Sequence, residues 1–228
     1  ALVRAKVALF SLAHQTDAVQ KAVTLRQYRN YANLAESYSA IPSSFLVITH
    51  GVSAVGKSHV AMRLVEALGA IRLRSDVERK RLFGEQKDAD LGKLSAGIYT
   101  QDASAATYQR LHQLAEAALH AGFPVVIDAT YLKQAQREAA SQVAEACGAP
   151  FLILECSAPD EVIASWLEQR KAAGSDPSDA TMDVVHAQQA SREALSDDEL
   201  LHSKRVDTHE SASLDTLIAR IRQRLTGL

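Results

Sequence analysis

One stretch of eight residues has the types and spacing of a phosphate-binding loop. It consists of Gly51, Val52, Ser53, Ala54, Val55, Gly56, Lys57 and Ser58. This order matches the Walker A pattern G-x-x-x-x-G-K-[ST], in which the glycines let successive backbone N–H groups converge on phosphate oxygens. Lys57 would reach the β- and γ-phosphates, and the Ser58 hydroxyl would ligate Mg²⁺. The sequence therefore predicts a site for ATP and Mg²⁺, with Ala54 standing where many such loops carry another glycine.

A carboxylate that could complete the metal site follows a second apolar run. Residues 124–128 read PVVID, and Asp128 ends the run. This is the position of a Walker B carboxylate, which holds Mg²⁺ directly or through water. The alternative is that Asp128 only caps the helix that follows it.

The charged run from Ala70 to Gly84 has two interpretations. Mixed charge of this kind usually forms a solvated helix face. If the run instead follows a strand beside the phosphate loop, Asp76 is placed to activate an acceptor hydroxyl, and Arg79 lies three residues on along the same helical face. Asp76 could alternatively cap the helix. We expect the neighbouring basic residues to point elsewhere; they are Arg74, Lys80 and Arg81.

Three further side chains are candidates for binding the acceptor or the phosphates. Thr130 and Arg137 follow Asp128 on the next loop and helix. Arg170 precedes a stretch rich in Gly, Ser, Asp and Pro, which would form a lid that brings its charge over the transferred phosphate. Arg170 could equally be a surface residue at a helix end, and Arg137 is then the reserve.

Alternating strand and helix patterns would position these residues. Apolar runs rich in β-branched residues alternate with amphipathic helices, which indicates a parallel α/β sheet with helices on both faces. The predicted strands cover 45–49, 70–74, 124–128, 151–155 and 205–207. In such a sheet, the residues that follow the strands face one crevice. Residues 1–39 have a helical pattern in which Val3, Val7 and Phe10 share a face, and Pro42 with two serines marks a boundary. We therefore expect a helical extension over 1–42 and a nucleotide-binding domain over 43–228.

Composition narrows the partners and the compartment. Lys and Arg total 25 against 27 Asp and Glu, and 5% of residues are aromatic. Such a chain offers neither a global basic field nor many platforms for base stacking, so nucleic acid is not an expected partner. Two cysteines are too few for a disulfide framework, and no apolar run has membrane-spanning length. These features indicate a cytoplasmic protein without membrane contact.

Four segments together resemble a known family. GVSAVGKS, IRLRSDVERKRLFG, VVIDATYL and LEQRKAAGSDPSDA occur in the order and spacing of AAA-type P-loop kinases related to zeta toxins and polynucleotide 5′-kinases. The likeness is strongest to the ATP-binding domain fused behind an aminoglycoside-phosphotransferase-like domain in predicted bacterial kinases. It covers residues 44–228. ALVRAKVAL and RQYRNYANLA also look like the last helices of such an upstream domain. The sequence begins with Ala1 and not with Met. The resemblance of these helices favours the explanation that the sequence is a piece of a longer polypeptide, over the explanation that a Met or a tag was removed.

The resemblance implies both a topology and a set of roles. The sheet order would be 2-3-1-4-5, Asp76 would activate a hydroxyl, Arg79 would bind the acceptor, and Arg170 would belong to the lid. One residue departs from the pattern, because Trp166 stands where relatives often carry a first lid arginine. The lid would then have a weaker positive charge.

We expect a kinase that phosphorylates a hydroxyl of a small or nucleotide-like acceptor. No N-K-x-D run for guanine is present in the sequence, and no Arg- and Gln-containing apparatus typical of oligomeric ATPases is evident in so short a chain. A nucleotide-binding regulatory module that transfers nothing is the alternative. A kinase acting on nucleic-acid 5′ ends is disfavoured by the composition.

Overall fold

The computed structural model describes residues 1–37, 44–83, 100–173 and 181–226. At 37, 101, 170–173, 211–213 and 222–226 it describes the backbone alone. The chain forms two compact units, Ala1–Ile41 and Pro42–Leu228. No helix among the described residues is both long enough and apolar enough to span a lipid bilayer.

The first unit is a pair of helices, α1 (Leu2–Ala13) and α2 (Ala18–Ser37), which pack against each other. Ala5 and Ala8 are buried between them. The apolar face that the sequence predicts for α1 lies instead on the outside of this unit. Within it, Val3 is 76% exposed and Phe10 is 61% exposed.

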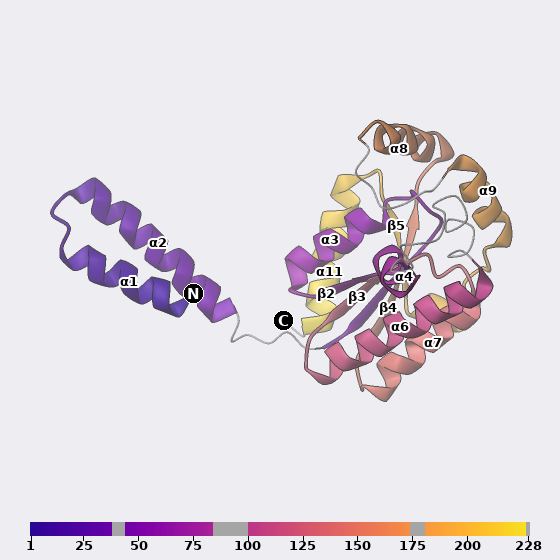
Figure 1. Ribbon diagram of the computed structural model, residues 1–228, viewed down its shortest axis with the longest axis horizontal. Coiled ribbons are helices and arrows are strands. Elements are labelled where there is room, and N and C mark those ends of the chain that lie inside the picture. The colour runs from indigo at the N-terminus through magenta and orange to yellow at the C-terminus, as the bar shows by residue number, and fades with distance from the viewer. Residues whose placement is uncertain (38–43, 84–99, 174–180, 227–228) are drawn as a thin grey trace. The chain divides into compact units, whose positions relative to one another are not determined.

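The second unit is built on a five-stranded parallel sheet with the order β2-β3-β1-β4-β5 (Figure 1). Its strands are β1 (Leu46–His50), β2 (Ile71–Arg74), β3 (Val125–Asp128), β4 (Phe151–Ser157) and β5 (Ser203–Asp207). The predicted α/β class and the implied strand order are both confirmed. β1 and β3 are buried along their whole length, as continuous apolar runs in parallel sheets require.

Helices cover both faces of the sheet. They are α3 (Lys57–Leu68), α4 (Ser75–Phe83), α6 (Gln101–His120), α7 (Gln134–Ala146), α8 (Asp160–Ala173), α9 (Met182–Ser191), α10 (Asp197–Leu201) and α11 (Ser211–Thr226). Side chains of α6 and α7 pack in one core cluster, on one face of the sheet. Side chains of α3 and α11 pack in the second cluster, on the opposite face.

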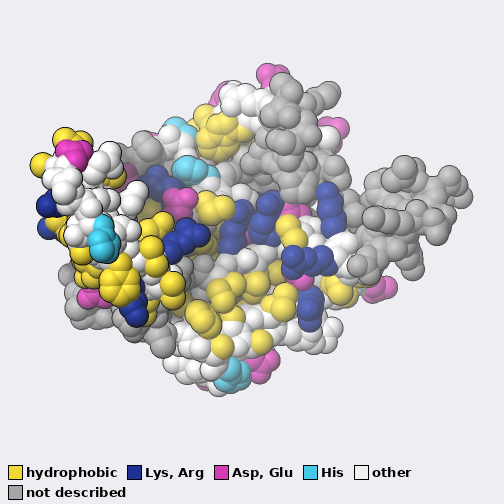
Figure 2. All heavy atoms as spheres, turned by 60° about the vertical axis from the view of Figure 1, so that its left-hand side comes forward, with side chains coloured by type: hydrophobic (Ala, Val, Ile, Leu, Met, Phe, Trp, Pro, Cys, Tyr) yellow, Lys and Arg dark blue, Asp and Glu magenta, His cyan; other side chains and the backbone are white. Residues whose placement is uncertain are grey.

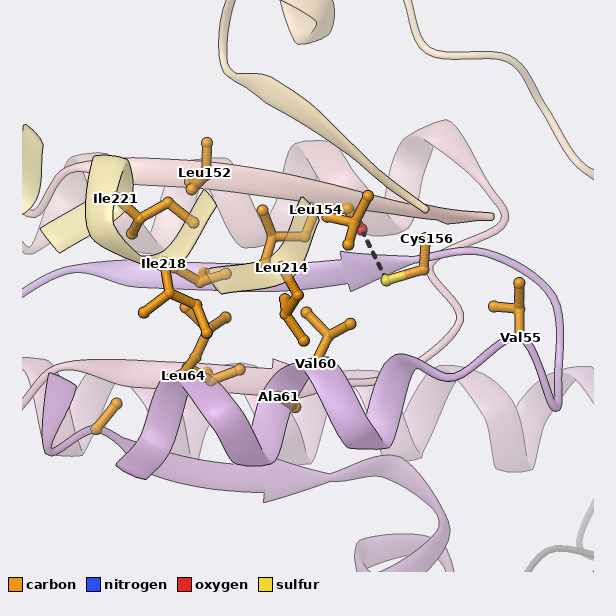
Figure 3. Close-up of a cluster of buried hydrophobic side chains, with 14 of the residues drawn as sticks. Val55, Val60, Ala61, Leu64, Leu152, Leu154, Cys156, Leu214, Ile218 and Ile221 are labelled. Carbon is orange, nitrogen blue, oxygen red and sulfur yellow. Dashed lines mark hydrogen bonds between the residues drawn. The ribbon is translucent and has the colours of Figure 1, made fainter. Parts of the chain in front are cut away.

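The second cluster anchors the phosphate loop to the hydrophobic core. Val60 and Leu64 of α3 meet Leu214 and Ile218 of α11 over the strands (Figure 3). Val55, from the loop itself, belongs to the same cluster and is 2% exposed. Burying large aliphatic side chains contributes about 1.5–3 kcal/mol each. The loop is therefore attached to a buried aliphatic core.

Candidate active site

Residues 51–58 connect β1 to α3, and two of them must be glycine. Gly51 has φ +142°, and a Cβ there would lie 2.6 Å from the Cys156 carbonyl oxygen. Gly56 has φ +87°, and a Cβ there would lie 2.9 Å from Thr208 Cβ. Both backbones adopt conformations that L side chains rarely take, at points of close approach. The glycines of the pattern therefore have direct steric causes in the fold.

Side chains and backbone from distant segments hold the loop in shape. The Gly51 N–H donates to the Thr130 carbonyl at 3.1 Å. The Thr208 hydroxyl lies 2.7 Å from the Val55 carbonyl oxygen. The Ser53 N–H donates to Gln188 Oε1 at 2.7 Å. Segments after β3, β5 and in α9 thus fix the loop before any ligand binds.

Lys57 and Ser58 begin α3 and face the predicted phosphate site. The Lys57 side chain is 8% exposed, and its ammonium group donates to the Val52 carbonyl. The Ser58 hydroxyl donates to Asp128 Oδ2 at 2.8 Å. The sheet order places β3 next to β1, which brings this carboxylate beside the loop.

Ser58 and Asp128 form a donor set that suits Mg²⁺. Both offer oxygen atoms, which Mg²⁺ prefers, and Mg²⁺ keeps its remaining positions for water and phosphate. Asp128 is 6% exposed and also accepts a hydrogen bond from Arg72. The alternative role of capping a helix is wrong, because α7 begins at Gln134 and has its N-cap at Lys133.

Asp76 lies in the first turn of α4, directly after β2. Its Oδ2 accepts from Arg74 Nη2 at 2.6 Å, and its Oδ1 accepts from the Val77 N–H at 3.0 Å. The helix already begins at Ser75, so Asp76 lies inside the helix and not at its cap. The carboxylate is held in one orientation by these two donors.

One cavity of about 460 Å³ joins the phosphate loop, Asp128, Asp76, Arg79 and Thr130. Ligand sites commonly occupy 300–1,000 Å³. The Thr130 hydroxyl lies 3.1 Å from the Tyr108 hydroxyl, which also accepts from the Tyr131 N–H at 3.0 Å. The sequence-predicted residues after β1, β2 and β3 therefore share one cavity.

The cavity wall is richer in positive charge than the sequence prediction allowed. Arg74 and Lys80, which we expected to point elsewhere, both line the cavity. Arg81 points elsewhere as expected, because it is 71% exposed and pairs with the buried Glu78 at 2.5 Å. The lining side chains that carry charge are Lys57, Asp76, Arg74, Arg79, Lys80, Asp128 and Lys133. Lys and Arg side chains also gather in a band on the face shown in Figure 2. Because five cations and two carboxylates line the cavity, its charge favours a negatively charged ligand.

Among the predicted binding residues whose side chains the structure describes, Arg137 lies outside the cavity. It is fully buried and does not line the cavity. Its guanidinium donates to both carboxylate oxygens of Glu199, at 2.6 and 3.0 Å. It also donates to the carbonyls of Tyr131, Glu193 and Ala194. These five bonds use all five N–H donors, so in this structure Arg137 has no donor left for an acceptor or a phosphate, contrary to the predicted binding role.

The predicted lid lies largely outside the described residues. The backbone of Arg170 belongs to α8, but its side chain is outside the described part of the chain. Residues 174–180, which were predicted to form the lid, also lie outside it, as do residues 84–99. The role of Arg170 stays a prediction.

His50 and Tyr131 form a buried link behind the loop. His50 Nδ1 lies 2.9 Å from the Tyr131 carbonyl oxygen. Burial, reinforced by the charges of Arg192 and Arg137, lowers the pKa of His50 from 6.5 to about 4. Tyr131 has φ +47°, an uncommon conformation for a bulky residue. The neutral imidazole therefore supports a strained residue directly after Thr130.

Residues that sequence reasoning missed also shape the site; among them are Arg72, Tyr108, Gln188 and Thr208, and of these four only Arg72 had a local signal. Arg72 alternates with Leu73 along β2, and this period of two puts it on the same face of the sheet as Asp128. Tyr108, Gln188 and Thr208 contact the site from segments far away in sequence. No spacing rule connects such residues to the loop.

Comparisons with known proteins agree on the fold. A family model described as an AAA domain matches residues 46–195. A comparison with curated proteins finds no significant match. Among solved structures, the chain resembles a sugar kinase from Janibacter sp. HTCC2649 with 22% identity and a TM-score of 0.57, covering 80% of this chain and 94% of that one.

Two further solved structures are similar to a comparable degree. A gluconokinase from Sinorhizobium meliloti 1021 has 18% identity and a TM-score of 0.57, covering 81% of this chain and 96% of that one. The APS kinase CysC of Mycobacterium tuberculosis, in complex with AMPPNP and APS, has 20% identity and a TM-score of 0.54. That match covers 79% of this chain and 96% of the kinase. At these identities the likeness describes the fold, which is that of P-loop kinases.

Proposed function

Because the chain belongs to the AAA domain family, and its phosphate loop shares a cavity with Asp76, we propose that it is an ATP-dependent kinase. It transfers the γ-phosphoryl group to a hydroxyl of a small or nucleotide-like acceptor. The shared cavity is the observation that carries this proposal. A nucleotide-binding loop alone would not require Asp76 in the same cavity.

The sheet order supports room for an acceptor beside the phosphate loop. β2 and β1 lie on either side of β3, so these two strands are about 10 Å apart, given a strand spacing of about 4.8 Å. This gap accommodates a transferred phosphoryl group and an acceptor hydroxyl between them. The Asp76 carboxylate then accepts the proton of the acceptor hydroxyl, while Arg74 holds Oδ2 of the same carboxylate.

The remaining residues bind and orient the ligands. The loop amides and Lys57 bind the triphosphate, and Ser58 and Asp128 would hold Mg²⁺, which neutralises phosphate charge when bound. Arg79 and Thr130, which line the cavity, contact the acceptor. Arg170 is proposed to reach the transferred phosphate from the lid. The solved structures named sugar kinase, gluconokinase and APS kinase support a small acceptor.

The helical pair α1 and α2 is proposed to pack against an upstream phosphotransferase-like domain. The support is its exposed apolar face, on which Val3, Val7 and Phe10 are 76%, 56% and 61% exposed within this unit. Faces of this kind commonly mark interaction sites. In a chain extended by such a domain, the amides of α1 should exchange hydrogen more slowly than in the present chain.

The test is a screen for acceptor-stimulated ATP consumption with sugars, sugar acids, nucleosides and nucleotide sugars. With the best acceptor, Asp76→Asn should lower turnover by about 10²–10⁴-fold, the usual contribution of a general base. Asp102→Asn is the matched control, because Asp102 is also in the first turn of a helix but is exposed and away from the cavity. Turnover that Asp76→Asn leaves intact would refute the catalytic role of Asp76.

The screen also tests the alternative that the protein is a nucleotide-binding regulatory module that transfers no phosphoryl group. That alternative predicts tight ATP binding without accelerated turnover for any acceptor. Measuring ATP affinity by calorimetry beside the turnover assay separates the two, since a kinase must show both.

A further inference from the structure

Arg72 binds the same carboxylate oxygen as the predicted metal ligand Ser58. Asp128 Oδ2 accepts one hydrogen bond from Ser58 Oγ at 2.8 Å and another from Arg72 Nη2. The side chains of Arg72 and Asp128 are only 14% and 5% exposed. A fixed positive charge is therefore in direct contact with the group that would hold Mg²⁺.

The position of Arg72 follows from the sheet. In the β2–β3 register, Arg72 is paired with Val126 and Arg74 with Asp128. Arg72 and Asp128 thus lie on the same face of the sheet, two positions apart along neighbouring strands. Arg72 is not among the residues that line the cavity, so it reaches Asp128 from the sheet side. Asp128 can therefore face a cavity ligand while it remains bound to Arg72.

Within the part of the chain that the structure describes, the buried position of Arg72 leaves one of its hydrogen-bond donors unsatisfied. Among the described residues, its Nε atom is buried and has no hydrogen-bond partner. A buried donor without an acceptor destabilises the fold, and each such group calls for an explanation. The contact with Asp128 supplies one, because it is the only hydrogen bond that the guanidinium makes within the described part of the chain.

We propose that Arg72 makes metal binding conditional on the nucleotide. Before the triphosphate binds, Asp128 is neutralised by Arg72, and the charge of Lys57 lies nearby on the same cavity wall. A free divalent cation meets net positive charge there and is repelled. The triphosphate brings negative charge, and the metal then binds together with it.

This inference extends the proposed function, since it concerns the metal site of the same cavity. Its test measures Mn²⁺ binding by electron paramagnetic resonance on the whole chain, with and without AMPPNP. Arg72→Gln should bind free Mn²⁺ at least tenfold more tightly than the wild type when no nucleotide is present. Free Mn²⁺ should also raise the melting temperature of this variant more than that of the wild type.

Three companion variants assign the effect. Arg72→Lys keeps the charge and should bind free Mn²⁺ as weakly as the wild type. Arg63→Gln removes the same charge from the exposed Arg63–Asp215 pair and should leave the affinity unchanged. Adding Asp128→Asn to Arg72→Gln should abolish the gained binding, which places the new site at Asp128. If Arg72→Gln does not fold, Arg72→Met fills a similar volume without charge and replaces it.

Two failures are distinguishable. Equal free-Mn²⁺ affinity in the wild type and the uncharged variant, with intact nucleotide-dependent binding, overturns the role of Arg72 alone. Absence of any Mn²⁺ binding by the wild type with AMPPNP overturns the metal site and the proposed function together.

Discussion

Acidification from pH 7 to pH 5 should destabilise the second unit through His50. The His50 ring is fully buried, and its Nδ1 faces a carbonyl oxygen, so Nδ1 carries the proton of the neutral ring. Its Nε2 is then unprotonated, and it has no hydrogen-bond partner within the described part of the chain. A second proton on Nε2 would place a buried charge near Arg192 and Arg137, which is why the pKa is lowered to about 4.

The magnitude follows from the difference between the two states. His50 titrates near 6.5 in the unfolded chain and near 4 in the folded one. As pH falls below 6.5, the unfolded chain takes up a proton that the folded chain refuses, so stability is lost. The loss between pH 7 and pH 5 is about 2 kcal/mol, because each unit of pKa difference is worth about 1.4 kcal/mol. It levels off below pH 4, where both states are protonated.

Urea unfolding of the wild type and of His50→Asn at both pH values tests this. The Asn amide keeps a donor for the Tyr131 carbonyl but does not titrate. The wild type should lose about 2 kcal/mol more than the variant on acidification. Other histidines titrate equally in both proteins and cancel in the difference. Equal losses in the two proteins would show that the folded state accepts a proton on His50 near pH 5, which would refute the reasoning.

Two substitutions test the phosphate loop and the buried arginine. Ala54 has φ +62°, a conformation that costs an L residue about 1–2 kcal/mol. Ala54→Gly should therefore raise the unfolding free energy by about 0.5–1 kcal/mol, after the greater flexibility of glycine in the unfolded chain is subtracted. A lower unfolding free energy in this variant would contradict the reasoning. Arg137→Met leaves the Glu199 carboxylate, which is only 12% exposed, without its cation and should lower the unfolding free energy by about 3–5 kcal/mol. Arg110→Met, at a residue whose side chain is 45% exposed, is the control, and similar small losses in both variants would show that the buried pair is not structural.

Much of the fold could be predicted because its signals are local. A β-branched apolar run before the Walker A pattern and an amphipathic helix after it predict β1, the loop and α3, and the structure has these elements within a residue or two. Asp76 and Asp128 were found because they follow strands of a parallel sheet, and such strand ends share one edge. Lys80 had a usable signal as well, since it lies four residues after Asp76 on the same helical face.

The errors came from partners that sequence alone does not reveal. An arginine on a helix near a phosphate loop is expected to bind phosphate, and Arg137 fits that pattern. Its bidentate partner Glu199 is 62 residues away, and Arg137 is fully buried. Which of two chemically plausible cations faces the cavity thus depends on tertiary packing, and no spacing along the chain encodes it.

The contact of Thr208 with the phosphate loop sets the order in which a nascent chain can acquire its nucleotide site. The Thr208 hydroxyl binds the Val55 carbonyl across 153 residues, and its side chain packs against Gly56. At about 5–20 residues per second, the ribosome needs on the order of 10 s to make that stretch. The loop is synthesised early but receives its last support late. A chain interrupted before β5 would therefore carry the complete Walker A motif and still lack the fully supported loop.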